Sequence, residues 1–378
     1  MSKIIRIGRD TSKSVQLHGV DAAEKPVLRE KLRRSQVLEF FSKLEPTLVG
    51  MEACAGAHYW ARELIALGHK VVLLPPQYVK PYVKRNKNHA ADVEAICEAM
   101  SRPTMRFVAV KTAEQQAALM LEGVRDSLIS RRTQLCNMIR GYAAEFGLVA
   151  AKGLDKIEPL LARVASDHTL PMLARELFAS HGEEYKRLKI EIAEIEAKLL
   201  TWHKDNELSR RLVAIPGIGP IGASLMAMKV ADPRAFRSGR DFSAWLGLTP
   251  KDHSTAGKTR LGVITRAGDE RLRSVLIVGA TAVIKQLRRG KTQASTWLMA
   301  LLRRKPPKLV AVALASKNAR VAWKLMVSGE AYNPARYGSL VGPADAARAG
   351  RGAALLARIA HQPTSGDDRD DQSITSSA

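Results

Sequence analysis

The sequence lacks the features of several common protein classes. Its 378 residues include only three cysteines, Cys54, Cys97 and Cys136, without CxxC spacing, which fits a reducing cytoplasm and neither a disulfide framework nor a zinc site. No apolar run reaches about 18 residues, and the N-terminus lacks the apolar core of a secretory signal, so we expect no membrane partner. No GxxxxGK[ST] motif is present, so no phosphate-binding loop for ATP is predicted.

Acidic residues are few relative to basic ones. Lys and Arg total 60 against 37 Asp and Glu, giving a formal net charge of +23 and a pI of about 10.1. Such a surplus attracts phosphate backbones and makes binding depend on salt. The composition therefore predicts a polyanionic partner such as nucleic acid; the alternative is a protein of the ribosome or of a membrane surface.

The N-terminal part, residues 3 to about 110, alternates strand and helix patterns. Three strand-like runs are followed by helix, strand, helix and strand, at residues 3–8, 14–20, 25–32, 34–44, 47–52, 57–68 and 70–76. This is the order of an RNase H-like α/β fold. The length and the 46% hydrophobic content suffice for two domains with their own cores.

Four side chains in this part predict a metal site. Asp10 and Glu52 each end a strand, and His89 and Asp92 begin an Ala-rich helical stretch. Because an i, i+3 spacing puts both side chains on one helix face, four donors can converge on a pair of Mg²⁺ ions. Each residue alone also fits a turn, a cap or an ion pair; their order along the chain favours a two-metal nuclease.

A basic segment precedes that helical stretch. Residues 78–89 interleave tyrosines with Lys80, Lys84, Arg85 and Lys87. Such a loop can grip phosphates and stack on bases. A solvated basic connector is an equally good interpretation.

The next part predicts two long helices, residues 112–147 and 183–203. Apolar residues recur every three or four positions in both: Leu121, Val124, Leu128, Leu135, Met138 and Tyr142 in the first, and Tyr185, Leu188, Ile192, Ile195, Leu199 and Trp202 in the second. Joined by an irregular stretch around 150–180, they suggest a coiled-coil hairpin that self-associates. The alternative is that the two helices simply pack on each other.

A mostly helical part is predicted from residue 207 to about 335. Gly217 and Gly219 in IPGIGP, before a helix near Ile221, form a helix-hairpin-helix signature whose backbone N–H groups can bind phosphate. A turn between two core helices is the alternative.

A polar stretch, residues 253–268, follows between two apolar helices. It contains small hydroxyl residues flanked by Lys258, Arg260 and Arg266. The stretch could hold a scissile phosphate, or it could be an ordinary polar linker.

From about residue 340 the chain is rich in Ala, Gly, Ser and Asp, which predicts a disordered tail. The expected division is 1–110, 111–206, 207–335 and 336–378.

Together, these motifs resemble one known family. The segments GRDTSK, MEACAGAHYWAREL, NKNHAADVEAICEAMSRPTMRFV, IPGIGPIGA and LGLTPKDHSTAGKTRLGVITRAGDERLR look like a DEDD transposase of the IS-one-ten insertion-sequence family, IS-eleven-eleven branch, over nearly all of residues 4–330. The resemblance implies a RuvC-like domain, a coiled coil and a C-terminal transposase domain with a helix-hairpin-helix motif. Members are also similar to site-specific DNA invertases, and at least some are directed to DNA by a structured RNA from the element's noncoding end.

The resemblance also implies a chemistry. The family's metal-binding acids, which would hold Mg²⁺ or Mn²⁺, map onto Asp10, Glu52, the His89 position and Asp92. Its nucleophilic serine maps onto Ser254, with Thr255 as the alternative, and Lys258, Arg260 and Arg266 would neutralise transition-state charge. The implied partners are element ends, target DNA, a guide RNA and further copies of the chain in a dimer or tetramer, in the bacterial cytoplasm at the nucleoid.

Two positions depart from the family pattern. His89 replaces the usual Asp, and Arg9 replaces an apolar residue before Asp10. Imidazole can ligate a divalent ion or act as a general base, but it removes one negative charge and suits Mn²⁺ better than Mg²⁺. Arg9 is expected on the opposite face of the strand, in a helix-covered core. These two departures favour one alternative, a catalytically impaired nucleic-acid-binding copy. The other alternative is a RuvC-like resolvase or nuclease that hydrolyses with water, in which Ser254 is structural.

Overall fold

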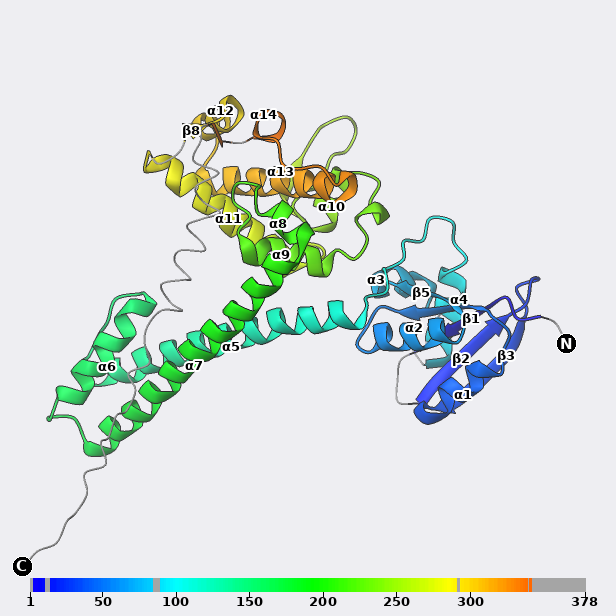
Figure 1. Cartoon of the computed structure of the whole chain (residues 1–378), viewed down its shortest axis with the longest axis horizontal. Coiled ribbons are helices and arrows are strands. Elements are labelled where there is room, and N and C mark those ends of the chain that lie inside the picture. The colour runs from blue at the N-terminus through cyan, green and yellow to red at the C-terminus, as the bar shows by residue number, and fades with distance from the viewer. Residues whose placement is uncertain (1–2, 11–13, 84–88, 291–292, 339, 342–378) are drawn as a thin grey trace, which may run out of the picture.

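The computed structural model describes residues 3–10, 14–83, 89–290, 293–338 and 340–341 (Figure 1). We call residues 3–110 the N-terminal region and residues 207–338 the C-terminal region. Two long helices, coloured cyan to green, run between them in Figure 1. None of the described helices is long and apolar enough to cross a membrane.

A five-stranded sheet forms the N-terminal region. Its strand order is β3-β2-β1-β4-β5, with β1 antiparallel to β2 and parallel to β4. The strands are β1 (Arg6–Arg9), β2 (Ser14–Val20), β3 (Pro26–Arg33), β4 (Leu48–Glu52) and β5 (Lys70–Leu74). The predicted order of strands and helices is the order observed, and the mixed α/β class is confirmed.

Helices cover both faces of this sheet. On one face, α1 (Val37–Ser42) and α2 (Ala57–Ala66) bury Phe41 and Trp60 against strand residues that include Ile7. On the other face lies α4 (His89–Ala99), which follows the short turns α3 (Pro76–Val79) and η2 (Lys80–Tyr82). Since successive strand residues point to opposite faces, neighbours in β1 meet different helices.

The long helices are α5 (Ala113–Glu145) and α7 (Met172–Asp205). Thr112 starts α5 with a capping box, since its hydroxyl accepts the Gln115 N–H at 3.1 Å. The stretch predicted as irregular contains α6 (Ile157–Ser166) and the first residues of α7. The prediction missed these because α6 is short and is stabilised by tertiary burial of its apolar face on α5 and α7.

The seam between the long helices differs from prediction on α5. Leu128 and Leu135 are buried as expected, whereas Val124, Met138 and Tyr142 are exposed. The buried face instead includes Cys136, Ile139 and Ala143, because α5 packs against both α6 and α7. On α7 the predicted residues Tyr185, Leu188, Ile192 and Leu199 are buried. The helices therefore pack on each other within one chain; self-association stays a prediction.

The C-terminal region is mostly helical, as predicted. One apolar core joins its main helices, with α13 in the centre. The helices are α8 (Glu207–Leu212), α9 (Pro220–Lys229), α10 (Gly239–Trp245), α11 (Glu270–Arg288), α12 (Thr296–Arg304), α13 (Pro307–Ser328) and α14 (Pro334–Tyr337).

Two small two-stranded sheets lie in this part of the chain. The first is a hairpin of β6 (Pro250–Asp252) and β7 (Leu261–Ile264). The second pairs β8 (Gln293–Ala294) with β9 (Leu340–Val341), which follows α12, α13 and α14. The predicted tail thus begins within α14, and its residues from 342 lie outside the described part.

Candidate active site

Asp10 and Glu52 lie at equivalent ends of neighbouring strands. The parallel register of β1 and β4 pairs Arg9 with Met51, so the next positions along both strands are Asp10 and Glu52. Adjacent strands lie about 4.8 Å apart. Asp10 is 9% exposed, and its Oδ1 accepts the N–H of Gln16 at 2.9 Å.

Two glycines let α4 rest directly on these strands. A Cβ at Gly8 would lie 2.2 Å from the Val93 carbonyl oxygen, and one at Gly50 would lie 2.6 Å from Met100 Sδ. Gly8 and Gly50 therefore point toward α4. Asp10 is two residues beyond Gly8, so it faces the same helix.

The same alignment of α4 with β1 brings His89 next to Asp10. One helical turn back from Val93 leads to His89, and two strand residues forward from Gly8 lead to Asp10, each a step of about 6 Å. His89 Nδ1 accordingly lies 3.3 Å from Asp10 Oδ2. The predicted pair is thus brought together.

The same register relates Asp92 to Glu52. Ile96 lies over Gly50, with its Cγ2 3.3 Å from an added Cβ. Asp92 precedes Ile96 by one turn, and Glu52 follows Gly50 by two strand residues, so both lie at the end of the sheet where His89 meets Asp10. All four predicted ligands share the α4 face of the sheet.

The donor set suits a hard divalent cation. Three carboxylates and one imidazole provide oxygen and nitrogen ligands of the kind that Mg²⁺ and Mn²⁺ accept. In the described part of the chain, no three His, Cys, Asp or Glu side chains lie close enough together to hold a metal ion. The backbone therefore gathers the four residues on one face without closing their side chains into a ligand cluster.

Arg9 lies on the opposite face, as alternation predicts, and is fully buried. Its guanidinium carbon lies 4.3 Å from the centre of the Trp60 ring, and Nη1 lies 2.9 Å from Met51 Sδ. Burial lowers the Arg9 pKa to about 10, which leaves it charged at neutral pH. Among the described residues, Arg9 Nε and Nη2 are buried without a hydrogen-bond partner. The cation–π contact with Trp60 therefore offsets only part of the cost of burying this charge.

Ser254 lies on the exposed loop of the β6–β7 hairpin. Its Oγ accepts the Arg260 N–H at 2.9 Å, and its own N–H donates to Asp252 Oδ1 at 2.8 Å. Hydrogen bonding from Ser254 lowers the pKa of Asp252, so that carboxylate is ionised near neutral pH. Among the described residues, the hydrogen bonds of Ser254 stay within the hairpin, and none joins it to the α4 face.

Three of the predicted cations lie on or directly after this hairpin, and the others belong to the N-terminal region. Lys258 and Arg260 are exposed on its loop, and Arg266 follows β7 with a φ of 57°. Lys80 is exposed in η2. Lys84, Arg85 and Lys87, which were predicted to contact nucleic acid, lie outside the described residues.

The two glycines of the IPGIGP turn serve different needs. Gly217 has a φ of 92°, and a Cβ there would lie 3.1 Å from the Gly279 carbonyl oxygen of α11. Asn318 donates to the Pro216 carbonyl at 2.8 Å in the core. A Cβ at Gly219 would meet nothing within 4 Å. Packing thus accounts for Gly217, and the predicted phosphate contact is sterically open at Gly219.

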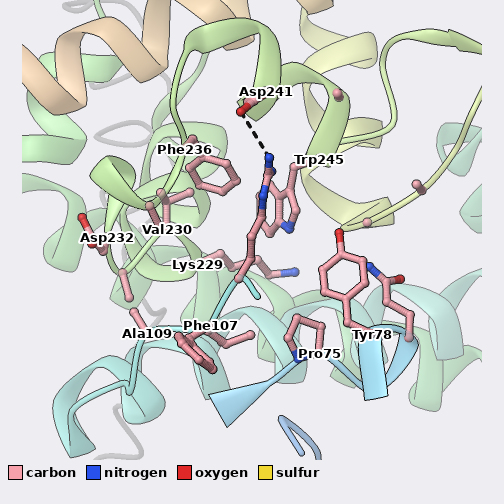
Figure 2. Close-up of a pocket in the computed structure, with 18 of the residues that line it drawn as sticks. Pro75, Tyr78, Phe107, Ala109, Lys229, Val230, Asp232, Phe236, Asp241 and Trp245 are labelled. Carbon is pink, nitrogen blue, oxygen red and sulfur yellow. Dashed lines mark ion pairs between the residues drawn. The ribbon is translucent and has the colours of Figure 1, made fainter. Parts of the chain in front are cut away.

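A pocket that was not predicted from the sequence lies between the N-terminal and C-terminal regions (Figure 2). Aromatic residues from both regions line it, including Tyr78, Phe107 and Trp245. A signal was present in RFVAVK, residues 106–111, where cations flank an exposed aromatic residue. The segment forms a pocket only because the fold places it against α10.

Known transposases match this chain. A sequence model described as "Transposase IS116/IS110/IS902 family" matches residues 209–295. A transposase of Sinorhizobium fredii is 64% identical over 89% of this chain and 87% of that protein. The transposase for insertion sequence element IS1328 of Yersinia enterocolitica is 39% identical over 88% of this chain and 100% of that protein. The transposase for IS1111A of Coxiella burnetii is 38% identical over 88% of this chain and 92% of that protein.

Proposed function

Because this chain belongs to the IS116/IS110/IS902 family of transposases, we propose that it cuts and rejoins the DNA strands of an insertion sequence with a RuvC-like carboxylate site and a serine nucleophile. The family is the one that the sequence motifs resemble. A transposase acts on DNA, and a net charge of +23 suits a polyanionic partner.

One observation carries the proposal: the register of α4 on β1 and β4. It gathers Asp10, Glu52, His89 and Asp92 on one face of the sheet. The strand order β3-β2-β1-β4-β5 supports an RNase H-like assignment. These residues would hold Mg²⁺ or Mn²⁺, which supplies positive charge that polarises a scissile phosphate and eases ionisation of an attacking hydroxyl.

Ser254 performs the covalent step in this proposal. Its Oγ forms a bond to phosphorus while the phosphorus–oxygen bond to one strand breaks, and the serine proton ends on the departing oxygen as a free hydroxyl. The hydroxyl of a partner strand then attacks the phosphoserine, forms the new phosphodiester and returns the proton to Ser254. The number of phosphodiester bonds is conserved, so no ATP is needed. Lys258, Arg260 and Arg266 neutralise charge on the phosphorane-like transition state.

Partners follow from the same proposal. Two DNA segments must be held together during exchange, so the chain acts as an oligomer. Val124, Met138 and Tyr142 leave apolar surface exposed on α5, which supports contact between copies. A structured guide RNA is a further proposed partner, supported by the basic surface and by the family resemblance.

A second candidate function is a RuvC-like nuclease or resolvase that uses water as the nucleophile. It is favoured by the hydrogen bonds of Ser254, which in the described chain remain within its own hairpin. A catalytically impaired copy is less well supported, because Arg9 packs under Trp60 on the opposite face of the sheet while Asp10 still lies beside His89 on the α4 face.

Trapping the covalent intermediate tests the proposal. The protein is incubated with labelled element-end DNA and divalent metal, denatured, and the peptide attached to DNA is mapped. Wild type should give an adduct on Ser254, Ser254→Ala should give neither adduct nor recombinant, and Thr255→Ala should only weaken both. An adduct on tyrosine, or products without any adduct, would favour the water-using enzyme.

A further inference from the structure

Residues of both the N-terminal and the C-terminal region form the walls of the pocket between them. A cavity of about 400 Å³ is bounded by residues that follow β5, by the segment 106–111, and by the segment from α9 to α10. Figure 2 shows Tyr78 and Phe107 on one side and Phe236 and Trp245 on the other. The volume lies at the lower end of the roughly 300–1,000 Å³ of small-molecule sites. A duplex is far too wide for this space.

Trp245 is held as a flat platform at the pocket wall. Its ring centre lies 5.3 Å from that of Phe236 and 5.8 Å from that of Phe242, which stacks on it. The residue nevertheless keeps 37% of its surface exposed. Tyr78 and Phe107 are 42% and 40% exposed across the cavity. Exposed, oriented aromatic faces suit stacking on a planar base.

Positive charge at the pocket is only partly compensated. Lys229 pairs with Asp269 at 2.8 Å. The half-buried Lys111 has its Nζ 3.1 Å from His58 Nε2, and in the described residues no carboxylate lies within ion-pair distance of it. Burial and then the nearby Lys229 lower the pKa of Lys111. An anion between these amines would relieve both effects. Arg106 adds a third cation, which pairs with Asp241 at 3.5 Å across the two regions (Figure 2, dashed line).

We infer that this pocket binds one unpaired nucleotide, with its base stacked on Trp245 and its phosphate near Lys111 and Lys229. The inference rests on the proposed function, because strand exchange and guide pairing both create unpaired nucleotides. Exposed aromatic faces and a cation without an ion pair, Lys111, together match the base and the phosphate of a nucleotide. The chemistry is shared by DNA and RNA, so the pocket alone does not select between them.

Binding of bulged and fully paired probes to the full-length chain tests the inference. Each probe is a short hairpin carrying the fluorescent base aminopurine, either as a single bulge or within the paired stem, in DNA and RNA versions. The bulged probe should bind more tightly, and its emission should fall on binding because the base stacks. Tighter binding of the bulged probe than of the paired probe, in the DNA series, the RNA series or both, identifies the source of the nucleotide.

Variants connect this preference to the pocket. Trp245→Ala should weaken binding of the bulged probe roughly 5- to 150-fold, the range of one lost base stack, and leave the paired probe unchanged. Trp297→Ala is the matched control, since Trp297 is 39% exposed beside Lys317 but lies outside the pocket. Phe107→Ala provides a second test that leaves the Trp245 aromatic cluster intact. Lys111→Gln should reduce the salt dependence of log affinity by about 0.7 to 0.9.

Two results would overturn the inference. One is equal binding of bulged and paired probes in both series, and the other is equal loss of affinity in the Trp245 and Trp297 variants. The proposed catalytic function fails by a different measurement, because the Ser254 adduct requires no bulged probe. Bulge preference without an adduct would keep the pocket and remove the serine mechanism.

Discussion

The α4 face of the sheet and the Ser254 hairpin, which carry the predicted chemistry, are built in different ways. On the α4 face, Asp10 is nearly buried and close packing at Gly8 and Gly50 fixes the register of the helix. On the hairpin, residues 250–263 are all exposed, and the hydrogen bonds of Ser254 are local. Close packing holds the backbone of a site in place without a ligand, whereas an exposed hairpin with few contacts becomes ordered when it binds a partner.

This difference predicts where substitutions act. Changes on the α4 face should alter folding and chemistry together, because α4 carries two of the predicted ligands and packs on the two strands that position the other two. Changes on the hairpin should alter chemistry with little effect on the free energy of unfolding, since exposed substitutions usually change it by less than about 0.5 kcal/mol. Measuring both quantities for each variant separates the two regions.

The largest expected effect follows from removing a carboxylate of the α4 face. Asp10→Ala or Asp92→Ala should reduce strand cleavage by at least about 10³-fold, because metal-assisted charge stabilisation contributes several kcal/mol. DNA binding, measured by fluorescence anisotropy, should be largely retained. Asp155→Ala is a control on an exposed aspartate that pairs only with neighbouring Lys156 in the described chain. Recombination near the wild-type rate in either variant would remove the metal-site assignment.

Close packing predicts the next effect. In Gly8→Ala the new Cβ would collide with the Val93 carbonyl, so α4 must move away from β1. Overpacking of this kind costs about 1–3 kcal/mol, and the displaced His89 and Asp92 should also slow cleavage. The measurement is the midpoint of chemical denaturation together with the cleavage rate.

Gly123→Ala is the matched control, because a Cβ at this position on α5 meets nothing within 4 Å. It should stabilise the helix by up to about 1 kcal/mol. If both alanine variants behaved alike, the close approach of α4 to β1 would not be what holds the site.

His89→Asp, also on the α4 face, should have a smaller effect on stability. His89 Nδ1 lies 3.3 Å from Asp10 Oδ2, so a second carboxylate there would repel Asp10 in the absence of a cation. The destabilisation without metal should stay below about 1 kcal/mol, since His89 is largely exposed. Activity in Mg²⁺ should be retained or raised, with a steeper dependence on metal concentration. Loss of activity would instead indicate a proton-transfer role for His89.

Local patterns predicted most of the N-terminal fold. Apolar alternation and Gly or Pro boundaries located the strands, and the same alternation placed Arg9 opposite Asp10. The contact of Arg9 with Trp60 could not be predicted, because the two residues meet only after α2 packs on the sheet. The sequence therefore supplied the direction of the side chain but not its neighbour.

The candidate site was predicted only in part, because tertiary packing decides which of its residues meet. The order of Asp10, Glu52, His89 and Asp92 is visible in the sequence, whereas their shared face depends on α4 lying over Gly8 and Gly50. The pocket was missed because its walls come from segments more than a hundred residues apart. Tertiary contact, not local pattern, brings Phe107 and Trp245 to one cavity.

An effect on stability of about the same small size concerns pH and belongs to the packed N-terminal region. His58 lies on α2, and its Nδ1 accepts the Lys111 N–H at 3.2 Å. Burial, followed by the charges of Lys111 and Arg62, lowers the His58 pKa to about 4. An unfolded histidine has a pKa of about 6.5, so as the pH falls from about 6.5 toward 4 the unfolded state binds the proton first and the folded state loses stability.

The size of this loss is about 1 kcal/mol after allowance for solvent screening of a half-exposed group. His58→Gln removes the titrating group, so its denaturation midpoint should fall less than that of wild type between about pH 7.5 and pH 4.5. His168→Gln is the control, because His168 is exposed on the turn before α7. An equal pH response in wild type and His58→Gln would show that acid sensitivity arises elsewhere, and the contact between α2 and residue 111 would then contribute nothing measurable to the pH dependence of the packed region.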